Sequence, residues 1–194
     1  MKTMEWLALA WATALLAGVA TPTAATTLIR ADLEALQRDH SIIAVGQVVA
    51  SHSYWNADRT FILTDVRFAM EGAVKGNTDG REIVITLMGG TVGKTTTLIV
   101  AGAELVPGRS YLLFLNRENL PGARGVVTVR EHSQGAFDLV ETPAGRLAIS
   151  QARGHALVPD ASGRTEPAGG QQGLPLDALI GQLKQLGTTR TEMK

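Results

Sequence analysis

The sequence predicts a mainly β protein, a small antiparallel barrel or sandwich with a short N-terminal helix and a C-terminal amphipathic helix. About seven short apolar segments recur between turns rich in glycine, proline and polar residues, a pattern typical of all-β domains. The chain of 194 residues contains 21 glycines and only 5% aromatic residues, which fits many short strands. At 45% hydrophobic residues it is large enough to bury a core without disulfides or metals.

Residues 1–25 predict a cleaved secretory signal peptide. Lys2 is followed by an apolar run from Trp6 to Ala20 and by the small residues Thr23-Ala24-Ala25. The run is about 15 residues long, shorter than the roughly 20 that a membrane span requires. We therefore expect an exported protein, periplasmic or extracellular, with no membrane span after cleavage. The sequence has no cysteine, which excludes thiol chemistry, disulfides and a lipid-anchored N-terminal cysteine, and is typical of bacterial export.

A β-rich domain is expected over residues 26–157, beginning with an amphipathic helix. Within Leu28–His40, the residues Ile29, Leu33 and Leu36 recur at helical spacing opposite charged positions. Ser41–Ser51 is predicted to be a buried strand in which Gly46 indicates a bulge or a tight bend, as at a barrel corner.

The remaining segments of this domain alternate between strand and turn patterns. The stretch "HSYWNADRT" is predicted as a turn, "FILTDVRFAM" as a half-exposed strand, and "EGAVKGNTDG" as a loop. "YLLFLN" is the most apolar segment and is expected to be a central strand. Further strands are predicted in "REIVITL", "TTTLIVAGAEL", "GVVTVRE", "AFDLVET" and "GRLAIS".

The composition changes after the β-rich domain. Residues 158–173, "VPDASGRTEPAGGQQG", are small and polar and predict a flexible linker or an exposed loop. Residues 174–187 predict an amphipathic helix, with Pro175 in its first turn and an apolar stripe at three- and four-residue steps. We expect this helix to dock on its own domain.

The stretch "MGGTVGKTTT", Met88–Thr97, resembles a phosphate-binding loop but fails its pattern. The motif G-x-x-x-x-G-K-[ST] requires glycine at position 88, where this chain has Met88. The β-branched run after Lys94 favours a strand, whereas a phosphate loop leads into a helix. A hairpin turn in which Gly89, Gly90 and Gly93 adopt positive φ is the better interpretation.

No catalytic, cofactor or metal site is predicted. The four histidines show no zinc-binding spacing, and neither H-E-x-x-H nor G-x-S-x-G occurs. The 18 basic and 18 acidic residues cancel, so no overall field would attract nucleic acid. Several carboxylates could pair in space, but no sequence pattern selects among them. They are Asp65, Glu71, Glu82, Glu104 and Glu118.

Tyr54 and Trp55 are candidate ligand contacts. They are two of the few aromatic residues after the signal peptide, and they lie in the predicted turn. An exposed aromatic pair there would suit a protein or small-ligand contact. The competing interpretation, which we favour, is that Trp55 folds back over one end of the barrel.

Residues 40–116 resemble a group of uncharacterised exported bacterial proteins. The shared elements are Gly46–Val48, Ile62–Thr64, Lys75-Gly76, Gly89–Gly93 and Pro107–Leu115. The resemblance implies no catalytic residues. A looser similarity links the segment to the OB-like barrel of netrin and tissue-inhibitor-of-metalloproteinase domains, which are held by disulfides that this chain lacks.

Three functions follow as hypotheses. The first is an exported, non-enzymatic binding module for another protein or a surface polymer. The second is a secreted hydrolase whose site is assembled from scattered Asp, Glu and His residues. The third, implied only by the looser resemblance, is an OB-like protease inhibitor.

Overall fold

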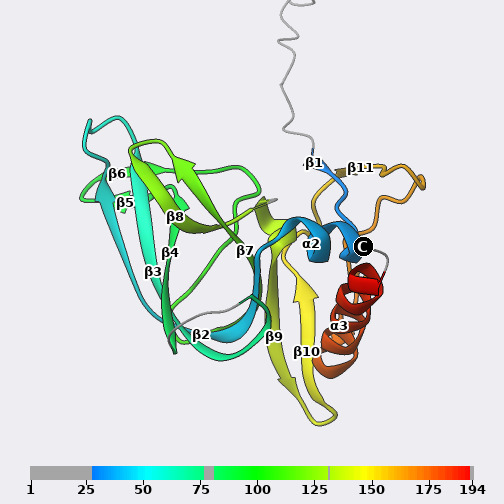
Figure 1. Ribbon diagram of the computed structural model, residues 1–194. Helices are drawn as coiled ribbons and strands as arrows, with labels where there is room; N and C mark the ends of the chain where they lie inside the picture. Colours follow the sequence, from blue (N-terminus) through cyan, green and yellow to red (C-terminus); the bar gives the residue numbers. More distant parts are fainter. Residues whose placement is uncertain (1–27, 77–80, 131, 193–194) are drawn as a thin grey trace, which may run out of the picture.

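The computed structural model describes residues 28–76, 81–130 and 132–192, with side chains to residue 189, and it is mainly β as predicted. The predicted signal peptide lies outside the described residues. Figure 1 shows a rounded group of strands on the left and two helices beside a flatter extension of the sheet on the right. The helices are α2 (Leu33–Asp39) and α3 (Leu176–Glu192). The longer strands are β2 (Ile42–Trp55), β3 (Ile62–Lys75), β4 (Glu82–Met88), β7 (Ser110–Leu120), β8 (Ala123–Val129), β9 (Ala136–Thr142) and β10 (Gly145–Ser150).

Five of these strands pair into a closed ring, here called the barrel. The order is β7-β2-β3-β4-β8, and β8 pairs back onto β7. All pairings are antiparallel except β4 with β8, which run parallel and meet at Ile85 and Val127. A closed ring has no unpaired edge, so the strands satisfy one another's backbone groups.

The sheet also extends away from the barrel. Strand β9 pairs with β7, β10 pairs with β9, and the short strand β12 (Leu174–Pro175) pairs with β10. Two small sheets complete the fold: β5 (Gly90–Val92) with β6 (Thr95–Thr97), and β1 (Leu28–Ile29) with β11 (Leu157–Val158). The extension gives the helices a surface to cover.

Strands β2 and β7 are buried on both faces and separate two cores. Leu113 and Leu115 of β7 point into the barrel with Phe68 and Val66 of β3, whereas Leu112 and Phe114 face the helices. Successive side chains in a strand alternate between its faces, so a continuous apolar run can serve two cores. This explains why "YLLFL" is apolar without alternation, and it confirms its prediction as a central strand.

The second core, here called the helix-layer core, lies between the extended sheet and the helices. Figure 1 shows α3 alongside β10 and α2 above the same side of the sheet. Leu179 and Leu183 of α3 meet Leu36 of α2 and Phe137 of β9, all of them at most 1% exposed. The prediction that the C-terminal helix docks on its own domain is therefore confirmed. Among the described residues, no helix is long and apolar enough to cross a membrane.

Several boundaries differ from the sequence-based prediction. Residues 28–29 form β1, and the helix begins only at Leu33, because Asp32 caps it by accepting a hydrogen bond from Ala35 N at 2.7 Å. Ile29 is consequently 70% exposed and is not part of a helical stripe. The C-terminal helix starts at Leu176, so Pro175 lies just before it, in β12.

The ends of several strands also differ from the sequence-based prediction. The predicted turn at 52–55 is the end of β2, and the predicted loop at 71–75 is the end of β3, because the two strands pair over almost their whole length. Backbone pairing here overrides the polar and glycine-rich local sequence. Conversely, the strand predicted through Leu98–Leu105 ends at Thr97, and Leu98 is 84% exposed. A register shift between Val45 and Gly46 confirms the predicted bulge.

The glycine-rich stretch is a hairpin turn, as predicted. β5 and β6 pair antiparallel with Gly93 and Lys94 between them. Gly89, Gly90 and Gly93 all have positive φ, of 91°, 133° and 61°. A Cβ atom on Gly90 would lie 2.2 Å from Thr64 Oγ1, so this position also requires glycine for space.

Candidate functional site

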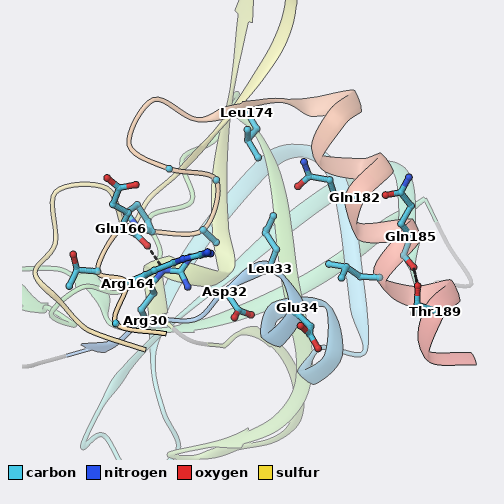
Figure 2. Close-up of a pocket in the computed structure, with 17 residues that line it drawn as sticks. Arg30, Asp32, Leu33, Glu34, Arg164, Glu166, Leu174, Gln182, Gln185 and Thr189 are labelled. Carbon is cyan, nitrogen blue, oxygen red and sulfur yellow. Dashed lines mark hydrogen bonds between the residues drawn. The ribbon is translucent and has the colours of Figure 1, made fainter. Parts of the chain in front are cut away.

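A large concave surface lies between α2, α3 and the loop that precedes β12. This groove has a volume of about 1140 Å³. Figure 2 shows Arg30, Arg164 and Glu166 along one wall, Gln182, Gln185 and Thr189 along the opposite wall, and Leu33 pointing between them. Clefts of this kind are the default location of a binding site.

The first wall is held by an ion pair between distant parts of the chain. The Arg30 guanidinium pairs with the Asp160 carboxylate, and the two side chains are only 8% and 12% exposed. Arg30 Nε also donates to the backbone carbonyl of Glu166. A largely buried ion pair is tolerated when further hydrogen bonds support its charges, and here Arg30 Nε and Asp160 Oδ1 each make at least one. The loop is therefore tied to the segment after β1.

Asp160 also organises the loop itself. Its Oδ1 accepts hydrogen bonds from the Ser162 amide at 2.8 Å, the Ser162 hydroxyl at 2.6 Å and the Arg164 amide at 3.1 Å. The Ser162 hydroxyl, the backbone amides of Arg164 and Ser162 and the Arg30 side chain lower the pKa of Asp160 from 3.8 to about 2, although burial opposes them. The carboxylate is thus ionised over the whole physiological range.

The predicted linker at 158–173 has a defined course in the structure. Val158 pairs with Ile29 in the β1–β11 sheet, and Pro167 and Ala168 are buried. Ala168 belongs to the helix-layer core. Most of the remaining residues of the segment are exposed, and whether it separates two units stays a prediction.

The segment that leads into α2 is held by one buried side chain. Gln134, 3% exposed, accepts a hydrogen bond from Ala31 N at 2.8 Å and donates to Ile29 O at 2.9 Å. This bidentate contact fixes the backbone on both sides of Arg30. It joins the groove to the short helical turn at His132–Gly135.

The second wall is the outer face of α3. Leu176, Leu179 and Leu183 are buried against the sheet, which turns Gln182 and Gln185 toward the groove (Figure 2). Amide side chains can donate and accept at once, as an extended peptide backbone requires. Leu33, Leu174 and Leu186 add apolar surface to the lining.

The groove combines amide groups, charges of both signs and leucines in an open trough. Glu34 and Glu166 supply carboxylates and Arg164 supplies a guanidinium, so no single charge dominates. Such a lining suits an extended chain with its own backbone polar groups and intermittent apolar side chains better than a small ion.

The predicted contact residues Tyr54 and Trp55 are not part of this groove. They are neighbours in β2 and therefore face opposite sides of the sheet, and both are half-buried. The Tyr54 hydroxyl donates to Asp65 Oδ1 at 3.2 Å, and its ring stacks on His52 at 6.2 Å. Burial, followed by the charge of Asp65 and this hydrogen bond, raises the pKa of Tyr54. Their role in binding stays a prediction.

The carboxylates considered from the sequence do not come together. Glu82 pairs with Arg67, Glu71 with Arg146 and Glu118 with Arg130, across neighbouring parts of the surface. Asp65 accepts from Thr86 Oγ1 at 2.8 Å as well as from Tyr54. Glu104 lies in a separate polar pocket. In the described part of the chain, no three Asp, Glu or His residues are arranged to hold a metal ion.

The groove residues were missed in the sequence because they come from three distant segments. Only the apolar stripe of α3, which left Gln182 and Gln185 on the opposite face, was a usable signal. Neither a family model nor a curated protein matches this chain.

Proposed function

We propose that the protein is an exported, non-enzymatic binding module that receives an extended peptide segment of a partner protein in the groove between α2 and α3. The predicted signal peptide supports export. The observation that carries the binding proposal is the groove itself, about 1140 Å³, with amide groups on one wall and a loop held by ion pairs on the other.

The barrel supports this role as a scaffold. We propose that it is of the OB type, because the ring order β7-β2-β3-β4-β8 with one parallel closure corresponds to the five-stranded Greek-key barrel of that class. A closed barrel is rigid, so strands β2 and β7 can present the helix layer in a fixed position. A binding surface built on rigid elements loses less entropy when it captures a ligand.

The proposal favours a peptide over a surface polysaccharide. Gln182 and Gln185 can pair with backbone amides and carbonyls, and the leucines of the lining can contact alternate side chains of an extended chain. Arg164 and Glu34 then add charge selectivity at the rim. If the protein bound surface polysaccharides and no peptides, this choice would be overturned.

The test is selection of binding peptides from a displayed random library, with affinities measured by calorimetry. Gln185→Trp would place a bulky side chain in the groove and is expected to weaken a selected peptide at least about tenfold. Lys184→Trp is the matched control: Lys184 is the adjacent residue and lines a different surface of α3. Equal affinity of both variants, or a library that yields no binder, would contradict the proposal.

The third hypothesis, protease inhibition, draws support from the same ring order. It predicts stoichiometric loss of activity when purified protein is titrated against secreted metalloproteases. Unchanged activity across such a panel would exclude it.

A further inference from the structure

A second, smaller concave site lies where the ends of β7, β9 and β10 meet. This polar pocket has a volume of about 250 Å³. Its lining contains Glu104, Arg109, Ser133, Asp138, Gln151, Arg153 and His155. Charges of both signs therefore converge on a space large enough for an amino acid, and none of the groove residues takes part.

The pocket contains a hydroxyl with no hydrogen-bond partner. Ser133 is 1% exposed, and its Oγ has no partner among the described residues. Buried polar groups without a partner are uncommon in folded proteins, because no hydrogen bond offsets the free energy lost when the group leaves water. The Ser133 amide is used, since it donates to Ala101 O at 2.8 Å. The hydroxyl therefore lies beneath the wall of the pocket, and the groups that the pocket presents to a ligand are its charged side chains.

The charges of the pocket are not paired with one another. No ion pair within 4 Å joins the two arginines, Arg109 and Arg153, to the two carboxylates, Glu104 and Asp138, in the described part of the chain. Elsewhere on the surface, Arg67, Arg130 and Arg146 each have a carboxylate partner. Two arginines and two carboxylates thus line one pocket without pairing with each other. This arrangement suits a ligand that carries both a positive and a negative charge.

One side chain holds the pocket in shape. Gln151 accepts from Glu104 N at 2.9 Å and donates to Glu104 O at 2.8 Å, and it also donates to Asp138 Oδ1 at 3.2 Å. These contacts fix the loop that carries Glu104 against β9. The ligand-facing groups are thus positioned before any ligand arrives, which lowers the entropy lost on binding.

We propose that this pocket binds a small zwitterion of the amino-acid type. Arg109 and Arg153 would receive the carboxylate, and Glu104 and Asp138 would receive the ammonium group. His155 also lines the pocket. The size of the pocket limits the ligand to a single residue or a dipeptide.

The geometry favours binding over hydrolysis. A serine hydrolase needs its hydroxyl hydrogen-bonded to a histidine and exposed to substrate. Ser133 Oγ is buried and makes no hydrogen bond to His155, so it is not activated as a nucleophile.

The test is a nuclear magnetic resonance titration of the purified protein with glycine, L-alanine, D-alanine and alanylalanine. We expect saturable shifts of the Ser133 and Gln151 amides with at least one of these probes. Acetate and methylammonium each carry one of the two charges and should bind at least about tenfold more weakly. Equal binding of acetate or of inorganic phosphate would show a simple anion site and overturn the proposal.

Variants complete the test. Arg153→Gln and Asp138→Asn are each expected to reduce affinity about tenfold or more, because each removes one charge from the site. Arg164→Gln, at the groove, is the matched control and should leave the affinity unchanged. The titration itself needs no variant, so a variant that fails to fold does not remove the test. The absence of saturable shifts with every probe in the wild-type protein would overturn the proposal.

Discussion

The barrel core and the helix-layer core share two strands but are built differently. In the barrel, hydrogen-bonded strands surround the side chains on all sides, and Phe68, Val66 and Ile85 are 0% exposed. The helix-layer core is closed by packing alone, since α3 pairs with no strand and meets the sheet through Leu176, Leu179 and Leu183. The candidate groove lies on this second region. The comparison indicates that the barrel supplies rigidity and that the helix layer supplies the binding surface.

The largest effect is expected in the barrel. Phe68→Ala should lower the free energy of unfolding by about 3–5 kcal/mol, because it leaves a cavity that the closed ring cannot fill by relaxation. Chemical denaturation monitored by circular dichroism measures this. A change below about 1 kcal/mol would show that the barrel interior collapses around the cavity, and would remove the distinction between the two cores.

A matched substitution in the helix layer should have a smaller and more local effect. Leu183→Ala is expected to cost about 2–5 kcal/mol of packing, partly relieved because α3 can shift against the sheet. Hydrogen exchange should then accelerate in α3 before it accelerates in β2 or β3. Equal acceleration in all three elements would mean that the two regions open as one unit.

The third prediction concerns the turn at one end of the barrel. Gly90→Val should destabilise the protein by about 1 kcal/mol or more, because Gly90 has a φ of 133° and a Cβ would meet Thr64 Oγ1 at 2.2 Å. Gly93→Val is the control, since its φ is also positive but no atom lies within 4 Å of its Cβ. Thermal melts in which Gly93→Val costs more than Gly90→Val would contradict the assignment.

A pH-dependent effect is expected in the groove loop. The pKa of Asp160 is lowered from 3.8 to about 2, so its contribution to stability is complete above 3.8 and is lost as the pH falls toward 2. Amide exchange of residues 160–166 should therefore accelerate over this interval relative to the barrel. In Asp160→Asn the acceleration should be present at all pH values, and a wild-type loop with no pH dependence would refute the role of this carboxylate.

The smallest effect is expected at Lys94. It lies exposed in the hairpin between β5 and β6, so Lys94→Ala should change the free energy of unfolding by less than about 0.5 kcal/mol. A larger loss in a thermal melt would point to an unrecognised role of this residue in the turn.

The strands were predictable because their signals are local. Alternation in "FILTDVRF" and the glycines of "MGGTVG" identify elements from neighbouring residues alone, and both interpretations are confirmed. The groove was not predictable, since it depends on Arg30 meeting Asp160 and on Gln134 holding Ile29 and Ala31. The polar residues of 158–173 looked like a linker for the same reason, because their partners lie more than a hundred residues away in the sequence.

The most direct test of the central claim is hydrogen exchange of the full chain with and without a selected peptide. Binding in the groove predicts protection of α3, of residues 30–36 and of the loop at 163–170, while the barrel strands β3 and β4 stay unchanged. Protection concentrated on β2 and β3 around Tyr54 and Asp65, with α3 unaffected, would contradict the claim and would place the binding surface on the barrel.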